Sequence, residues 1–147
     1  MAVTISIAGP DDADELTAAL VGLVPQLSSS NPPPALGAVV AMLNHQAVTQ
    51  FLARDDNGTI VGVSTLAVFP SPTGQRAWIE DVIVDEGCSG QGIGQLLTEA
   101  MLQRARELDC ITVDLTSRPS REAANHLYRK VGFQQRETNV YRIARET

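Results

Sequence analysis

Residues 81–97 read DVIVDEGCSGQGIGQLL, and this stretch decides the fold class. It begins with a short apolar run typical of a buried strand. The glycines Gly90, Gly92 and Gly94 follow in a loop, which opens a helix predicted over 92–108 from apolar residues at three- and four-residue spacing. Backbone N–H groups at a helix N-terminus, free of Cβ atoms, form an anion site. The stretch therefore predicts a strand–loop–helix unit that binds phosphate or pyrophosphate.

The glycine spacing does not match two other phosphate-binding loops. A Walker loop ends in Gly-Lys-Ser/Thr, whereas Ile93 follows Gly92 here. A dinucleotide-binding loop of the form G-x-G-x-x-G needs a third glycine where Gln95 or Leu97 stands. A plain turn from strand to helix stays as the alternative to an anion site.

Strands and helices alternate around this unit. Asp55-Asp56-Asn57-Gly58 predicts a hairpin, because Asn-Gly tolerates positive φ. Ser120 is the predicted N-cap of the last helix, and Gly132 ends it. The order predicts an α/β fold of α+β type, with a mixed, mostly antiparallel central sheet, helices on both faces and one parallel crossover. The predicted strands are 3–7, 48–54, 60–69, 76–84, 111–115 and 134–143, and the predicted helices are about 11–24, 34–45, 92–108 and 120–130.

Length and composition exclude several classes of protein. A chain of 147 residues predicts a single domain over 1–147. The 44% hydrophobic and 19% charged residues are typical of a soluble globular protein. No apolar run reaches the roughly 18 residues that a membrane span needs. The first residues, MAVTISIAGPDD, lack a basic leader, so we expect a cytoplasmic protein without a membrane partner.

The charge is unevenly distributed along the chain. The net charge of −6 argues against a nucleic-acid partner, which favours a basic surface. Residues 1–117 carry four basic and fourteen acidic side chains, whereas residues 118–145 carry seven basic and two acidic ones. This basic C-terminal quarter indicates that an anionic group docks near the end of the chain, with a solvated basic face as the alternative. The two cysteines and two histidines have no zinc-ligand spacing, so we expect no metal.

Two motifs together resemble a known family. Ser89-Gly90-Gln91-Gly92-Ile93-Gly94 resembles the Q/R-x-x-G-x-G/A signature of the GNAT family of N-acetyltransferases. Downstream, Ala124, Leu127-Tyr128 and Gly132-Phe133 are similar to the second motif of that family. The resemblance is strongest over 80–133, and it implies a GNAT-like acyl-CoA N-acyltransferase fold.

The resemblance implies an acetyl-CoA site. Val82-Ile83-Val84 would pair with the pantetheine arm and polarise the thioester carbonyl, and Tyr128 would lie beside the CoA sulfur as a proton donor. Ser89 departs from the usual Arg or Gln. Arg121 stands where many members have an Asn that touches CoA, and we rank it ahead of Asn125 for that contact. The implied pyrophosphate loop is Gly90, Gln91, Gly92, Ile93, Gly94 and Gln95, acting mainly through backbone N–H groups.

The catalytic base is less sharply defined by the sequence. Glu80 and Asp81 are adjacent, and strand alternation predicts that they face opposite sides, with Glu80 on the side of Val82 and Val84. Glu80 is the first candidate for the base, and Asp81 or a water molecule is the alternative. Glu-Asp before Val-x-Val also resembles the glucosamine-6-phosphate acetyltransferase branch of the family.

The sequence thus predicts an enzyme that moves the acetyl group of acetyl-CoA directly to a primary amine of a small molecule or peptide. The acidic residues of 1–117 would suit such a cationic acceptor. The alternative is a non-catalytic acyl-CoA-binding or sensor module on the same fold. A homodimer is compatible with the resemblance.

Overall fold

The computed structural model describes residues 2–146, which form two compact units. The first unit ends at Thr116 and the second begins at Ser117. The first contains β1 (Thr4–Ile7), a 3₁₀ turn (Pro10–Asp12), α1 (Ala13–Leu27), α2 (Leu36–Leu43), β2 (Val48–Arg54), β3 (Ile60–Ser71), β4 (Gly74–Val84), a second 3₁₀ turn (Glu86–Cys88), α3 (Ile93–Glu107) and β5 (Thr112–Asp114). The second contains α4 (Glu122–Lys130).

The first unit is built on a five-stranded sheet in the order β1-β2-β3-β4-β5. Neighbouring strands are antiparallel except β4 and β5, which are parallel across the α3 crossover. The predicted mixed, mostly antiparallel sheet is confirmed. The hairpin between β2 and β3 is also confirmed: Gly58 has φ +78°, and Asp55 Oδ1 accepts hydrogen bonds from the N–H groups of Asn57 and Thr59 at 2.9 and 3.0 Å.

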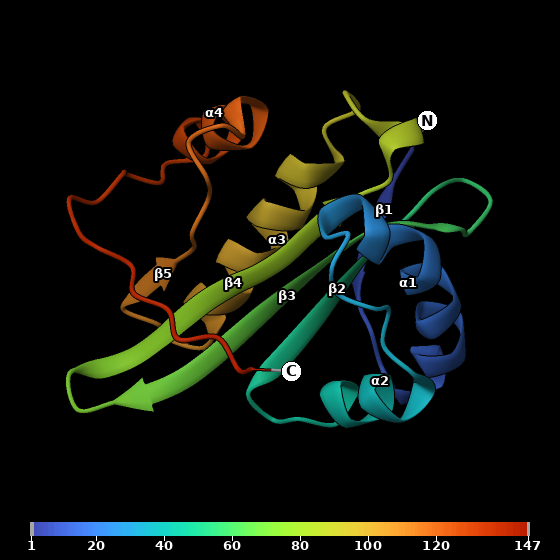
Figure 1. The fold of residues 1–147 in the computed structure, drawn as a ribbon, viewed down its shortest axis with the longest axis horizontal. Helices are drawn as coiled ribbons and strands as arrows, with labels where there is room; N and C mark the ends of the chain where they lie inside the picture. The colour runs from blue at the N-terminus through green and yellow to red at the C-terminus, as the bar shows by residue number, and fades with distance from the viewer. Residues whose placement is uncertain (1, 147) are drawn as a thin grey trace. The chain divides into compact units, whose positions relative to one another are not determined.

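Helices cover both faces of this sheet (Figure 1). Val63 of β3 faces the side of α1 and α2, and its neighbour Gly62 faces α3, where Ile93 and Leu97 pack closely against it. Burial of these apolar faces is the main stabilising contribution to the unit. The core on the α1 and α2 side includes Leu16, Leu20, Leu23, Val39, Leu52, Val63 and Ile83.

A β-bulge interrupts β4 near Asp81. Thr65 is paired with Glu80 and Val63 with Ile83, so two steps along β3 correspond to three steps along β4. Because Val63 and Thr65 share a face, Ile83 and Glu80 share it too. Asp81, inside the bulge, has φ +48°. The predicted alternation, with Glu80 beside Val82 and Val84, is therefore wrong, because a bulge shifts the two-residue period by one.

The second unit contains α4 and an irregular C-terminal segment. Arg121, not Ser120, is the N-cap of α4, and it makes no side-chain cap within the described chain. Residues 134–143, predicted as a strand, are irregular, so that prediction is wrong. The apolar side chains of Val140 and Ile143 are 68% and 101% exposed, and a strand is stable only when a partner satisfies its backbone.

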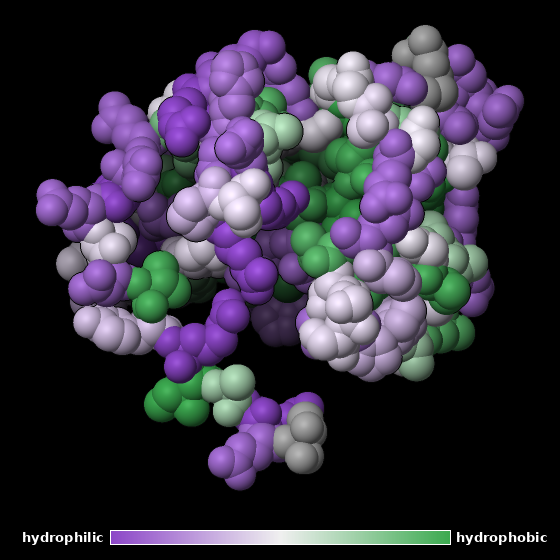
Figure 2. Space-filling view, turned by 45° about the horizontal axis from the view of Figure 1, so that its top comes forward, coloured by the Kyte–Doolittle hydropathy of each residue, from purple (hydrophilic) through white to green (hydrophobic). Residues whose placement is uncertain are grey.

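The surface is mainly hydrophilic on the face shown in Figure 2. Among the described residues, no helix combines the length and the apolar character that crossing a membrane requires.

Candidate active site

The predicted glycine loop forms the N-terminus of α3. Gly92 is the N-cap with φ +77°, and Gly90 has φ +80°. The first bond of the helix runs from the N–H of Leu96 to the carbonyl of Gly92, at 3.1 Å. Within residues 2–146, the backbone N–H groups from Gly90 to Gln95 donate no hydrogen bond. Six unpaired donors at the positive end of a 15-residue helix favour an anionic ligand.

The loop also leaves room for that ligand. A Cβ atom built on Gly90 or on Gly92 would meet no heavy atom within 4 Å. The glycines are therefore required by their left-handed backbone and not by close packing. A diphosphate can approach the backbone directly, so the residues present fit the pyrophosphate of a nucleotide cofactor.

The strand that leads into the loop has an open edge. β5 pairs with β4 only at Arg76, Ala77 and Trp78. Beyond Trp78, this edge of β4 has no strand partner in the described chain, whereas the other edge stays paired with β3 up to Val84. An extended ligand can add to such an edge by main-chain hydrogen bonds. Val82, Ile83 and Val84, predicted to pair with a pantetheine arm, lie in this half-paired segment.

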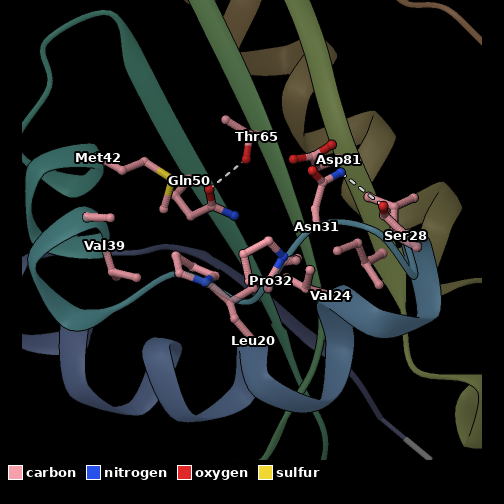
Figure 3. Close-up of a pocket in the computed structure, with 15 residues that line it drawn as sticks. Leu20, Val24, Ser28, Asn31, Pro32, Val39, Met42, Gln50, Thr65 and Asp81 are labelled. Carbon is pink, nitrogen blue, oxygen red and sulfur yellow. Dashed lines mark hydrogen bonds between the residues drawn. The ribbon is translucent and has the colours of Figure 1, made fainter. Parts of the chain in front are cut away.

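A cavity of about 340 Å³ lies between the sheet and helices α1 and α2 of the first unit (Figure 3). Its wall is mainly apolar and includes the loop that joins the two helices. The side chains that line it are Leu20, Val24, Leu27, Ser28, Asn31, Pro32, Pro34, Ala38, Val39, Met42, Gln50, Val63, Thr65, Asp81 and Ile83.

Two polar residues on the sheet side of the cavity are bonded to each other. Thr65 Oγ1 donates to Gln50 Oε1 at 2.7 Å, and Gln50 Nε2 donates to the Ser64 carbonyl at 3.0 Å. Gln50 is only 4% exposed, so this bonding satisfies an otherwise costly buried amide. Sequence reasoning missed this pair. The available signal was Gln50, a polar residue inside the otherwise mainly apolar strand predicted over 48–54.

The two candidate carboxylates differ in their surroundings. Glu80 and Asp81 are both exposed, and Trp78 Nε1 donates a hydrogen bond of 2.8 Å to Glu80 Oε1. Asp81 lines the cavity, and its carboxylate has no hydrogen-bond or ion-pair partner among residues 2–146. Figure 3 shows Asp81 together with the Gln50–Thr65 pair at the cavity. The bulge thus places Asp81 at the cavity, next to Glu80, which does not line it.

One side chain ties helix α1 to the segment before the glycine loop. Gln26 Nε2 donates to Asp85 Oδ1 at 3.0 Å, and Gln26 Oε1 accepts from the N–H of Glu86 at 2.8 Å. The same Nε2 also bonds the Gly22 carbonyl at 3.0 Å, which fixes the amide on its own helix. Sequence reasoning gave no signal for this long-range contact.

In the second unit, Tyr128 lies on α4 and is 8% exposed. Its ring meets the Phe133 ring edge-on, with 5.8 Å between centroids. Burial raises the pKa of Tyr128 above its usual value, and the positive charge of Arg121 opposes that shift only in part. The phenol is therefore protonated at neutral pH.

Arg121 and Asn125, the two candidates for a cofactor contact, differ in availability. Asn125 Nδ2 donates to the carbonyls of Arg118 at 2.9 Å and Arg121 at 2.8 Å, which uses both of its N–H groups. The Arg121 guanidinium makes no hydrogen bond or ion pair inside the described range. This difference favours Arg121. No group of three metal-ligand side chains occurs in the part of the chain that the structure describes.

Comparison with known proteins identifies the family. The model of the family described as Acetyltransferase (GNAT) family matches residues 23–133, which is more than half of the chain. The chain belongs to the GNAT acetyltransferase family. The predicted family and the predicted GNAT fold are both confirmed.

Individual GNAT relatives act on different acceptors. The chain is 32% identical over 89 residues to mycothiol acetyltransferase of Propionibacterium freudenreichii subsp. shermanii, covering 60% of this chain and 28% of that protein. It is 34% identical over 96 residues to glucosamine 6-phosphate N-acetyltransferase of Trypanosoma brucei brucei, covering 63% of each. The chain thus spans less than two thirds of the length of either curated relative.

A solved structure agrees over almost the whole chain. It is a protein of Agrobacterium tumefaciens provisionally assigned as an acetyltransferase, with a TM-score of 0.82 and 27% identity, covering 97% of this chain and 99% of that one. The match shows that the GNAT fold extends beyond the segment that the family model covers.

Proposed function

We propose that this chain transfers the acetyl group of acetyl-CoA directly to a primary amine of a small molecule or peptide. The observation that carries the proposal is the order of features along β4 and α3: a strand edge and then six N–H donors, all of them without a partner among residues 2–146. The strand edge suits the extended, amide-bearing arm of acetyl-CoA, and the N–H donors suit its pyrophosphate. The cavity beside β4 supplies room for an acceptor.

The residues proposed to hold the cofactor act mainly through their backbone. Gly90 to Gln95 would bind the pyrophosphate, and Val82 to Val84 would bind the pantetheine arm. Arg121 would add a charge-assisted contact to a phosphate, because its guanidinium is not used elsewhere in residues 2–146. When bound, acetyl-CoA supplies an activated acetyl thioester.

In this reaction the nitrogen loses two protons in all, one from the ammonium before attack and one after the C–N bond has formed, and the second of these restores the proton that the thiolate receives. Overall, an ammonium and a thioester become an amide, a free thiol and one released proton. A C–N bond forms and the C–S bond breaks. The ammonium must first lose a proton to expose its lone pair, and the departing thiolate must gain one.

The proposed roles are those that the family resemblance and the sequence imply for each group. Glu80 takes the proton of the amine, directly or through a water molecule, with Asp81 next to it on the bulge. Tyr128 keeps its proton at neutral pH because burial raises its pKa, and it donates that proton to the thiolate. A backbone N–H on the open edge of β4 stabilises the developing oxyanion, an effect of about 10²–10³ in rate in other enzymes.

The test combines turnover with cofactor binding. The protein is incubated with acetyl-CoA and a panel of primary amines, with free thiol followed by colour and products by mass. Tyr128→Phe should lower kcat and leave the Kd of CoA unchanged. Tyr141→Phe is the matched control, because the Tyr141 side chain is 88% exposed.

Two results would contradict the proposal. Stabilisation by acetyl-CoA without acetylation of any amine would favour the non-catalytic binding module. No rise in melting temperature with CoA would mean that the glycine loop is only a turn, because a ligand that binds only the native state must stabilise it.

A further inference from the structure

We infer that the acceptor is a small amine with an apolar body, and that Asp81 is the residue that recognises its ammonium group. The inference rests on the proposed function, because it assigns the acceptor of that reaction to the cavity beside β4.

The cavity sets the size and the polarity of the acceptor. Its volume of about 340 Å³ is at the lower end of the range for small-molecule pockets, roughly 300–1,000 Å³. Ten of its fifteen lining residues are apolar, mainly aliphatic side chains and prolines. An acceptor whose body is a short aliphatic chain or a small ring would bury apolar area there, and burial of that kind drives binding.

The charge in the cavity selects a cation. Among the fifteen lining residues, Asp81 is the one that carries a charge. The neighbouring Gln50–Thr65 pair is already joined by a hydrogen bond, so it competes little for a ligand. An ammonium would gain a charge-assisted hydrogen bond to Asp81. A phosphate in the same cavity would be repelled by that carboxylate, which disfavours a phosphorylated sugar as the acceptor.

The backbone explains why Asp81, and not its neighbour, takes this position. An aspartate with φ +48° is uncommon, and such conformations persist where the surrounding structure imposes them. Here the bulge imposes it, and the result is that Asp81 lines the cavity. Glu80 is held by the Trp78 indole at 2.8 Å. Asp81 is thus the carboxylate of this pair without a partner among the described residues. It is also adjacent to Val82, where the open edge would present the thioester.

The experiment compares three ligands and three variants. The ligands are hexylamine, its neutral analogue hexanol, and glucosamine 6-phosphate. Asp81→Asn keeps the shape and the tolerance of positive φ while it removes the charge. Asp109→Asn is the matched control, because Asp109 has φ +57° at the end of α3 and does not line the cavity. Glu80→Gln reports on the neighbouring carboxylate. Binding is measured without acetyl-CoA by NMR titration, and turnover is measured separately.

We expect Asp81→Asn to weaken hexylamine binding about two- to fivefold, the range for a charge pair at an exposed carboxylate. Hexanol should bind wild type and Asp81→Asn alike, and Asp109→Asn should match wild type. The inference is overturned if Asp81→Asn changes hexylamine binding less than twofold, if Glu80→Gln weakens it more, or if glucosamine 6-phosphate binds better than hexylamine.

The same experiment separates this inference from the proposed function. Charge-dependent binding of hexylamine without acetylation of any amine would support the recognition role of Asp81 and overturn the proposed reaction. Acetylation of amines at the same rate by wild type and Asp81→Asn would support the proposed reaction and overturn the recognition role of Asp81.

Discussion

Replacing Gly92 by alanine tests whether the loop before α3 binds the cofactor through its backbone. Gly92 has φ +77° and open space around the missing Cβ, so alanine introduces strain without a clash. Gly58, in the β2–β3 turn, has φ +78° and equally open space. The two glycines are therefore a matched pair that differ in whether they belong to the proposed pyrophosphate loop.

The stability cost should be the same at both positions. A left-handed non-glycine residue costs about 1–2 kcal/mol. Part of this is offset by the lower entropy of the unfolded chain, roughly 0.4–1 kcal/mol for Gly→Ala. We therefore expect each variant to lose about 1 kcal/mol in free energy of unfolding.

The cost in cofactor affinity should differ. In Gly92→Ala, either the new methyl group occupies the space where the ligand approaches or the peptide turns and withdraws an N–H donor. Loss of one hydrogen bond to a charged group costs about 1.5–3 kcal/mol, which is roughly a tenfold to hundredfold weaker Kd. Gly58→Ala should leave the Kd of CoA unchanged.

Urea denaturation gives the stability of both variants, and calorimetry with CoA gives their affinity. The reasoning is refuted if Gly92→Ala binds CoA as wild type does, or if Gly58→Ala loses as much affinity as Gly92→Ala. Unequal losses of stability would show that the backbone strain at the two glycines was misjudged.

Three further predictions concern stability. Gly62→Ala would place a Cβ 3.2 Å from Ile93 Cγ2. We expect this overpacking to lower the free energy of unfolding, measured with urea, by about 1–3 kcal/mol. Unchanged stability would contradict the close packing of α3 on β3. Burial raises the pKa of Tyr128. Its contribution to the free energy of unfolding is therefore complete below pH about 10 and falls as the pH rises further. Between pH 8 and about 11, the free energy of unfolding of Tyr128→Phe should therefore fall less than that of wild type. Equal decreases in the two proteins would exclude this cause. Arg54 donates to Glu15 at 2.6 Å on a partly exposed surface, so Arg54→Met should cost less than about 1 kcal/mol, and still less in 1 M salt. A larger, salt-independent loss would point to packing of the arginine stem.

The sequence predicts well what depends on local chemistry. The Asn57-Gly58 turn and the apolar period of α3 have local causes, and both elements lie where the pattern places them. The glycine loop is also local, because its conformation depends on residues that tolerate positive φ. The donors from Gly90 to Gln95 could therefore be predicted as a group.

Features that depend on distant partners were not predicted. The bulge at Asp81 arises from the pairing of β4 with β3, and simple alternation in the sequence of β4 does not reveal it. The segment 134–143 has apolar residues suited to a strand but is irregular, since a strand also needs a neighbour. The cavity combines α1, α2 and three strands, so its lining could not be identified from any one segment.

If acetyl-CoA and an acceptor bind as proposed, the amide of Gln26 links their two sites. It joins α1, which forms part of the cavity wall, to Asp85 and Glu86, which lead into the glycine loop. A shift of α1 on acceptor binding would move the loop as well, so the two affinities are expected to be coupled. Thermodynamic linkage requires that coupling to be reciprocal: the factor by which CoA changes acceptor affinity equals the factor by which the acceptor changes CoA affinity. A single side chain can in this way make the filling of one site depend on the other.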